Sequence, residues 1–150
     1  MNKFKKLIFV CTGNTCRSPM AEAIYKNLDQ EDEIQVTSRG LVVLFSEPIN
    51  PKAELILNKY NLDPVNHVAR GLKKQDIDDE TLILTMTNSH KNNILEQFPD
   101  AAVRTIKEFV GEEGDVTDPY GGSLLEYEES YIELSRLVKK TMYKLRDVNE

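Results

Sequence analysis

A cysteine and an arginine with five residues between them lie in a short polar segment that follows an apolar run. The apolar run is Leu7-Ile8-Phe9-Val10, and the polar segment is Cys11-Thr12-Gly13-Asn14-Thr15-Cys16-Arg17-Ser18-Pro19. A tight loop that contains a glycine can point its backbone N–H groups inward. A helix that begins at the end of such a loop adds the partial positive charge of its N-terminus. Arg17 can bind two phosphate oxygens at once, so the segment is typical of a phosphate-binding loop.

The same features stabilise the anionic thiolate form of a cysteine placed at position 11. A thiolate that faces a bound phosphate is a nucleophile directed at phosphorus. Each residue also has a structural interpretation: Cys11 as a small buried residue at a strand end, Arg17 as a surface charge and Ser18 as a helix cap. The three together, in a strand–loop–helix context, favour the chemical interpretation.

The elements around this segment alternate between strand and helix. Apolar runs predict strands at 5–10, 34–38, 81–86 and 103–106. Helices are expected at 18–28 with Ser18 as the cap, from Pro51, near 73–77, from a cap at Asn88, and along an apolar stripe at 124–145. Such alternation predicts a parallel sheet covered by helices on both faces. Ligands bind beyond the carboxyl ends of such strands, where residues 11–18 are expected to lie.

The composition is that of one ordinary domain, and we expect residues 1–150 to form it. Of the 150 residues, 40% are hydrophobic and 29% are charged, and the net charge is −6. A chain this acidic is a poor candidate for binding nucleic acid or an anionic membrane, and we expect a monomer. Two cysteines make neither a disulfide framework nor a zinc site, so no metal is expected. No signal peptide is recognisable at the N-terminus, which predicts a cytoplasmic location.

The segment from Val10 to Pro19 resembles the signature of the low-molecular-weight protein tyrosine phosphatases. Asp118-Pro119-Tyr120 resembles the general-acid segment of the same family, and the resemblance spans essentially the whole chain. It implies an α/β, flavodoxin-like three-layer sandwich with a four-stranded parallel sheet and helices on both faces. It also implies hydrolysis of phosphoprotein substrates through a phosphocysteine intermediate, with no metal and no cofactor.

The resemblance implies a role for each residue of the signature. Cys11 would be the nucleophile and Arg17 the phosphate clamp. Asp118 would protonate the leaving group and then activate water, although Asp-Pro-Tyr is also ordinary turn chemistry. Ser18 would hydrogen-bond the sulfur of Cys11. The other members of the implied phosphate-binding loop are Thr12, Gly13, Asn14, Thr15 and Cys16.

Residues outside the loop are implied to support it. Asn14 is expected to adopt a left-handed conformation, held by hydrogen bonds from Ser38 and His67. His90 matches no family position and is expected at the surface.

The substrate is expected to meet an aromatic wall at Tyr120. The family often has a second aromatic residue directly after it, where this chain has Gly121-Gly122. Leu44 or Phe45 would supply the opposite wall or else pack in the core.

Three positions leave alternatives open. Cys16 either forms a protective reversible disulfide with Cys11 or only fills space under the loop. Thr12 and Thr15 stand where the family commonly has aliphatic residues, and this form resembles a bacterial branch that includes protein arginine phosphatases. Phosphotyrosine is therefore the first substrate to consider and phosphoarginine the second. An arsenate reductase or a phosphate-binding protein without activity is the remaining alternative, but the chain lacks the further cysteines of the former.

Overall fold

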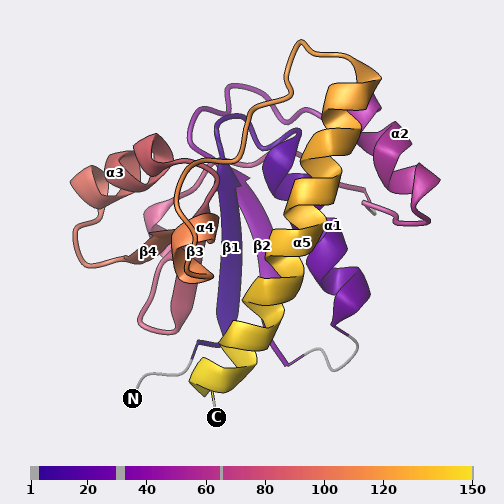
Figure 1. Cartoon of the computed structure of the whole chain (residues 1–150). Coiled ribbons are helices and arrows are strands. Elements are labelled where there is room, and N and C mark those ends of the chain that lie inside the picture. The colour runs from indigo at the N-terminus through magenta and orange to yellow at the C-terminus, as the bar shows by residue number, and fades with distance from the viewer. Residues whose placement is uncertain (1–3, 30–32, 65, 150) are drawn as a thin grey trace.

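The computed structural model describes residues 4–29, 33–64 and 66–149, and its centre is a parallel sheet (Figure 1). The strands are β1 (Lys6–Cys11), β2 (Gln35–Gly40), β3 (Thr81–Thr85) and β4 (Ala102–Thr105). Their order is β2-β1-β3-β4, and every pairing is parallel. The chain leaves β1 for β2 on one side and later crosses to β3 on the other. The strand order therefore reverses at the carboxyl end of β1, where sheets of this kind bind ligands.

Helices cover both faces of the sheet, which gives the three layers of the predicted flavodoxin-like fold. On one face lie α1 (Arg17–Leu28) and the long α5 (Leu124–Asn149), with α2 (Pro51–Lys59) and the short α4 (Ile106–Phe109) packed against α5. On the other face lie α3 (Asn88–Gln97) and the segment around the 3₁₀ turn η1 (Lys74–Asp76).

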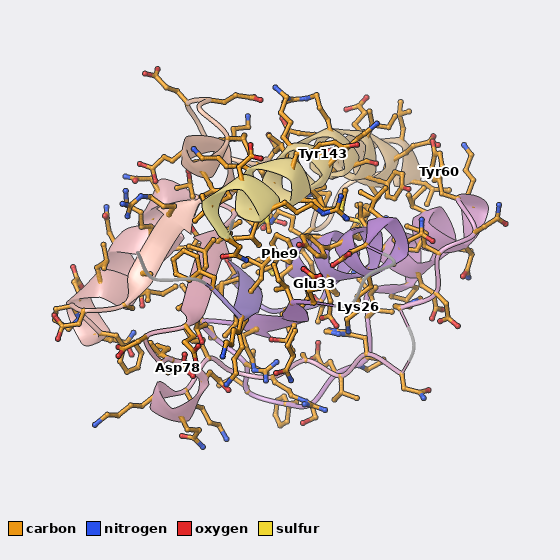
Figure 2. All side chains as sticks on the ribbon, turned by 90° about the horizontal axis from the view of Figure 1, so that it is seen from below. Phe9, Lys26, Glu33, Tyr60, Asp78 and Tyr143 are labelled. Atoms are coloured by element: carbon orange, nitrogen blue, oxygen red, sulfur yellow. The ribbon has the colours of Figure 1, made fainter. Side chains whose placement is uncertain are left out.

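The alternation of side chains along the strands produces the two cores. Leu7 and Phe9 of β1 belong to the core under α1 and α5, whereas Ile8 and Val10 belong to the smaller core that includes Ile94 of α3. Successive strand residues point to opposite faces, so a strand buried on both faces must be apolar throughout. Figure 2 shows Phe9 between the sheet and the helices, with Tyr143 of α5 at the outside.

Three details of the helices differ from the sequence-based expectations. The first helix begins at Arg17, with Cys16 as its cap residue, so the prediction that Ser18 caps it is wrong. Helix α3 begins at Asn88, but Thr87 caps it by accepting a hydrogen bond from the backbone N–H of His90. The apolar stripe of α5 is buried except at its first residue, Leu124, which is exposed.

Helix α4 was not predicted, because a four-residue helix carries no hydrophobic period. A capping box does mark its start: Thr105 accepts from the backbone N–H of Glu108, whose side chain accepts from the backbone N–H of Thr105. That Thr-x-x-Glu spacing was the available signal. None of the helices in the described part of the chain combines the length and apolar character needed to cross a bilayer.

Candidate active site

The loop between β1 and α1 is held in place by backbone hydrogen bonds. The carbonyl of Thr12 accepts from the backbone N–H groups of Leu41 and Val42, each at 2.9 Å, and that of Thr15 accepts from Asn50 at 2.9 Å. The loop packs directly on Gly40 at the end of β2. A Cβ atom at Gly40 would lie 2.9 Å from the carbonyl oxygen of Thr12 and 3.0 Å from the nitrogen of Asn14. The close approach of the two backbones therefore requires glycine at this position.

The sulfur of Cys11 has a polar neighbour on the first turn of α1. The Cys11 Sγ and Ser18 Oγ atoms lie 2.9 Å apart, and both residues are buried. The side-chain amide of Asn14 donates to Ser18 Oγ at 2.8 Å. The Ser18 hydroxyl also lies 3.4 Å from the carbonyl oxygen of Arg39, so its proton has two acceptors within reach. The sulfur is the nearer of the two, and a hydrogen bond donated to it stabilises a thiolate. Ser18 thus contacts the sulfur, as predicted, instead of capping the helix.

Asn14, in the middle of the loop, is fully buried and has a left-handed backbone conformation, with φ at 58°. Its carbonyl accepts from Nε2 of His67 at 2.7 Å, and its Oδ1 accepts from the backbone N–H of Arg70 at 3.0 Å. The prediction that Ser38 hydrogen-bonds Asn14 is wrong, because the Ser38 hydroxyl donates to Glu22 at 2.6 Å. The second support of Asn14 is the backbone of Arg70, and a main-chain donor leaves no signal in a sequence.

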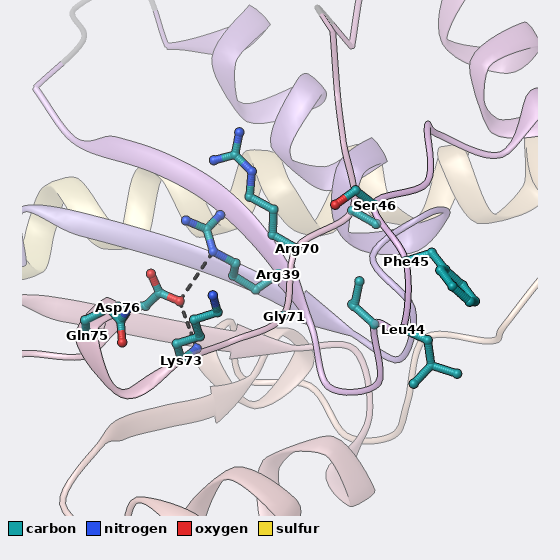
Figure 3. A pocket seen from close by; sticks show the side chains of 11 residues that line it. Arg39, Leu44, Phe45, Ser46, Arg70, Gly71, Lys73, Gln75 and Asp76 are labelled. Atoms are coloured by element: carbon teal, nitrogen blue, oxygen red, sulfur yellow. Dashed lines mark hydrogen bonds and ion pairs between the residues drawn. The ribbon is translucent and has the colours of Figure 1, made fainter.

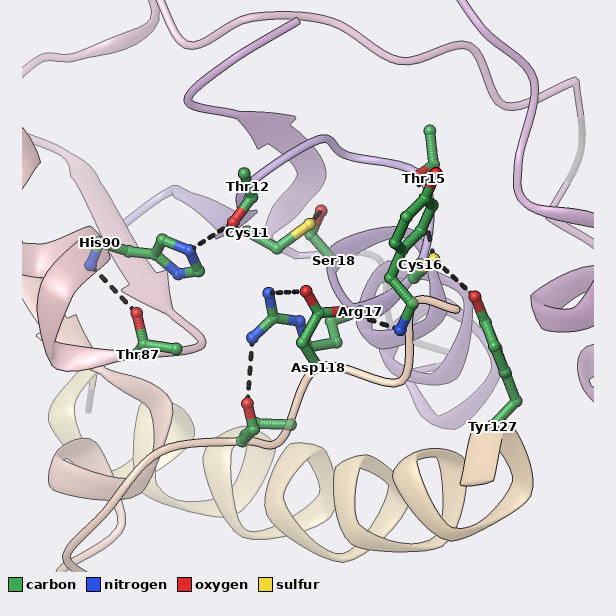
Figure 4. A network of polar contacts seen from close by, with 12 residues as sticks. Cys11, Thr12, Thr15, Cys16, Arg17, Ser18, Thr87, His90, Asp118 and Tyr127 are labelled. Atoms are coloured by element: carbon green, nitrogen blue, oxygen red, sulfur yellow. Dashed lines mark hydrogen bonds and ion pairs between the residues drawn. The ribbon is translucent and has the colours of Figure 1, made fainter. Parts of the chain in front are cut away.

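Arg17 and Asp118 meet at the base of the site (Figure 4). The guanidinium of Arg17 is buried; it donates to the carbonyl of Val116 at 3.0 Å and lies 3.5 Å from Oδ2 of Asp118. The other carboxylate oxygen of Asp118 accepts from the backbone N–H of Tyr120 at 3.0 Å. The turn interpretation and the acid interpretation of Asp118 are therefore compatible, because the turn holds one oxygen and leaves the other facing the arginine.

A pocket of about 410 Å³ joins these residues to an apolar mouth. Cys11, Arg17 and Asp118 line it together with Leu44 and Phe45. The last two are 82% and 73% exposed, so they are wall residues and do not pack in the core. Tyr120 lines the pocket as well and is 73% exposed. The pocket thus offers a charged floor for an anion and apolar walls for the group that carries it.

His90 contacts the phosphate-binding loop from outside the pocket, which was not predicted from the sequence. The prediction that it lies at the surface is wrong, since it is only 8% exposed and its Nε2 lies 2.9 Å from the hydroxyl oxygen of Thr12. Its other ring nitrogen is buried, with no hydrogen-bond partner among the described residues. Burial, together with the positive charge of Arg17, lowers the pKa of His90 to about 4. The available signal was its place four residues before the core residue Ile94 on one helix face.

Cys16 lies beneath the loop as a free thiol, as does Cys11. Its sulfur is 3.4 Å from the hydroxyl of Tyr127 on α5, and both residues are buried. Burial raises the pKa of the Cys16 thiol, so this sulfur is kept in its neutral, less reactive form. Within residues 4–29, 33–64 and 66–149, no cluster of three histidine, cysteine or acidic side chains is arranged to hold a metal ion.

Comparisons with known proteins agree with this geometry. The family model described as low molecular weight phosphotyrosine protein phosphatase matches residues 6–150. The low molecular weight protein-tyrosine-phosphatase PtpB of Staphylococcus epidermidis is 40% identical over 140 residues, covering 93% of this chain and 98% of the relative. The protein-arginine-phosphatase of Bacillus subtilis is 40% identical over 148 residues, covering 93% and 96%. The solved structure of the YwlE arginine phosphatase from Geobacillus stearothermophilus superposes with a TM-score of 0.89 at 38% identity, covering 95% of this chain and 93% of that one.

Proposed function

Because this chain belongs to the low molecular weight phosphotyrosine protein phosphatase family, we propose that Cys11, Arg17 and Asp118 carry its hydrolysis of phosphorylated protein side chains. The observation that carries the assignment is their convergence. The sulfur, the guanidinium and the carboxylate line one pocket, although Asp118 is far from the other two in sequence.

The first step transfers the phosphoryl group to sulfur. The Cys11 thiolate attacks phosphorus, so an S–P bond forms while the bond from phosphorus to the leaving group breaks. The leaving oxygen takes a proton from Asp118, so the product leaves as a neutral phenol and not as a phenolate anion, which is a poorer leaving group. Arg17 and the backbone N–H groups of the loop and of the first turn of α1 stabilise the charge on the phosphoryl oxygens.

The second step returns the enzyme to its starting state. The carboxylate of Asp118, now without its proton, accepts one from a water molecule as that water attacks the phosphocysteine. The S–P bond breaks, inorganic phosphate leaves, and the thiolate is regenerated. Ser18 stabilises the departing thiolate through its hydroxyl, which lies 2.9 Å from the sulfur.

Phosphotyrosine is the first substrate that the pocket supports. The exposed side chains of Leu44, Phe45 and Tyr120 line the mouth on the way to the loop. Apolar walls of this kind bury the two faces of an aromatic ring, while the phosphate reaches the charged floor.

Phosphoarginine is the second candidate, and Thr15 is the observation that favours it. Thr15 lines the same pocket, where its hydroxyl can accept a hydrogen bond from a guanidinium. The chemistry is then the same, except that a P–N bond breaks and a guanidinium nitrogen takes the proton from Asp118. Relatives named for each activity are equally similar to this chain, at 40% identity.

The test is a comparison of kcat/KM on one peptide that carries either phosphotyrosine or phosphoarginine, in the presence of a chelator. Hydrolysis of either one, with a phosphocysteine trapped by rapid acid quench, supports the proposal. Absence of turnover on both peptides and on p-nitrophenyl phosphate would overturn it.

A further inference from the structure

A second cleft, of about 430 Å³, adjoins the catalytic pocket (Figure 3). Residues 43–45 line both cavities, so the two share one wall. The rest of the cleft is formed by Arg39 at the end of β2 and by Ser46, Ala69, Arg70, Gly71, Lys73, Gln75 and Asp76. A peptide whose phosphorylated side chain enters the catalytic pocket can therefore extend over the shared wall into this cleft.

The cleft concentrates positive charge on an acidic protein. Arg39 is half-buried, and its Nε lies 3.4 Å from the carboxylate of Asp76, so these two charges largely neutralise each other. Arg70 and Lys73 also line the cleft and are exposed. Within the described ranges no carboxylate pairs with the side chain of either residue. Two uncompensated positive charges thus lie beside the active site of a chain with a net charge of −6.

Hydrogen bonds of the main chain hold residues 70–73, which carry Arg70 and Lys73, in a defined place. Gly40 donates to the carbonyl of Arg70 at 2.8 Å and accepts from the N–H of Leu72 at 2.9 Å. The N–H of Arg70 donates to Asn14 in the phosphate-binding loop, and the N–H of Lys73 donates to Asp76. The hydrogen bond from Arg70 to Asn14 thereby ties the cleft to the catalytic loop. A preformed site loses less entropy on binding.

We propose that this basic cleft binds aspartate or glutamate side chains of the phosphoprotein substrate, close in sequence to the phosphorylated residue. The inference rests on the proposed phosphatase function and adds a substrate preference to it. Carboxylates match the fork of Arg70 and the point charge of Lys73. Because both cations are exposed, they act mainly on the rate of encounter and on KM, and salt weakens their effect.

Three phosphotyrosine peptides test the proposal: one with acidic residues beside the phosphotyrosine, one with glutamine and asparagine in their place, and one with a phosphoserine there. The variant is Lys73→Glu. Its matched control is Lys74→Glu, which makes the same change of charge one residue away, on η1, outside the cleft lining. Neither lysine belongs to the catalytic machinery, so both variants keep the wild-type rate on p-nitrophenyl phosphate.

We expect the wild-type protein to favour the acidic peptide over the neutral one by about fivefold in kcat/KM, the effect of roughly one close charge pair in water. Lys73→Glu removes or inverts that preference, whereas Lys74→Glu keeps most of it. The ratio for Arg70→Gln, which retains the backbone N–H, falls in the same way as that for Lys73→Glu. Equal losses in the two lysine variants, or no wild-type preference, would overturn the proposal. A preference for the phosphoserine peptide alone would replace carboxylates with a second phosphate as the occupant and overturn it too.

A binding measurement separates this proposal from the proposed function. An unphosphorylated acidic peptide is titrated into isotope-labelled protein, and the amide signals of Gly71 and Lys73 are followed by NMR. Selective shifts without any phosphatase activity would support the cleft and refute the function. Full activity without shifts or substrate preference would refute the cleft alone. Titration with inorganic phosphate is the second arm: shifts at the catalytic loop alone agree with the proposal, and equal shifts in the cleft would make it a general anion site, against the proposal.

Discussion

The hydroxyl oxygen of Thr12 lies 2.9 Å from Nε2 of His90, although the two residues are 78 positions apart in the chain. The contact joins the phosphate-binding loop to the first turn of α3 (Figure 4). An aliphatic residue at position 12 could not make it. Because the other ring nitrogen is buried and unpartnered within the described residues, the imidazole is held in its neutral form.

A pH dependence of stability follows from this burial. The pKa of His90 in the folded chain is about 4, against an ordinary value of 6.5. Above pH 6.5 the imidazole is neutral in both states and contributes no slope. Between pH 6.5 and about 4 the unfolded chain binds a proton that the folded chain does not, so the free energy of unfolding falls as the pH falls.

The variant His90→Gln should lack this contribution. Urea unfolding of both proteins across the window measures it, and the quantity to plot is the difference between their unfolding free energies. His67 is present in both proteins and cancels in that difference. A difference that stays flat from pH 6.5 to about 4 would show that His90 is not buried as a neutral group.

Cys11→Ser should abolish turnover while the fold and the phosphate cradle remain. An alcohol is a far weaker nucleophile than a thiolate at neutral pH, whereas Arg17 and the loop N–H groups are unchanged. Steady-state rates and the affinity for inorganic phosphate are the two measurements. More than about a tenth of the wild-type rate would mean that sulfur is not the nucleophile.

Asp118→Asn should slow catalysis by roughly 100- to 10,000-fold, the usual contribution of a general acid and base. The amide keeps the acceptor for the N–H of Tyr120, so the turn survives. The substitution removes the proton donor and the charge that faces Arg17. A leaving group such as nitrophenolate needs little protonation and should lose less rate than a poorer one. A series of substrates with different leaving groups gives the answer, and equal losses along it would assign Asp118 a structural role instead.

The local parts of this site could be predicted, because each depends on a short stretch of chain. The strand before Cys11, the loop and the helix after it are encoded within about twenty residues, and their order brings Cys11 and Arg17 to the same pocket. The apolar period of α5 similarly identified its buried face. The role of Asp118 as the general acid could be predicted only from the resemblance to the phosphatase family, since an Asp-Pro-Tyr segment alone indicates only a turn.

The parts that failed depend on tertiary pairing. Ser38 has a hydroxyl that could serve Asn14, but the fold brings Glu22 of α1 next to it. The donor that replaces it is the backbone of Arg70, which any residue except proline could supply. Ser18 could cap a helix by local rules, yet its hydroxyl is used by the sulfur of Cys11. Local propensity cannot decide between such alternatives.

Gly40→Ala tests the packing of the loop on β2. The added Cβ would meet backbone atoms of Thr12 and Asn14 at 2.9 and 3.0 Å, so the loop must shift. We expect a loss of about 1–3 kcal/mol in unfolding free energy and a large loss of activity. Gly71→Ala is the matched control, because Gly71 bridges to Gly40 but has no atom within 4 Å of an added Cβ. Similar losses in the two variants would show that the effect does not come from the loop contact.

Substrate choice is tested at Thr15, whose side chain lines the pocket. If its hydroxyl accepts a hydrogen bond from a guanidinium, Thr15→Ile should shift preference from phosphoarginine toward phosphotyrosine, because it removes a polar contact and adds an aliphatic wall. A site that hydrogen-bonds its substrate discriminates far more strongly than a difference of one methyl group, which is worth about 10- to 200-fold. The quantity to measure is the ratio of kcat/KM for the two substrates, since general damage to the loop cancels in it.

Thr15→Val separates the two causes at this position, because it removes the hydroxyl and keeps the size of the side chain. A shift of the ratio that is already present in Thr15→Val assigns the selectivity to the hydrogen bond. A shift confined to Thr15→Ile assigns it to the shape of the wall. A change of less than about threefold in both variants, well below what either effect supplies, would make Thr15 neutral. A wild-type protein that ignores phosphoarginine would leave phosphotyrosine as the substrate class, because the apolar mouth formed by Leu44, Phe45 and Tyr120 does not depend on Thr15.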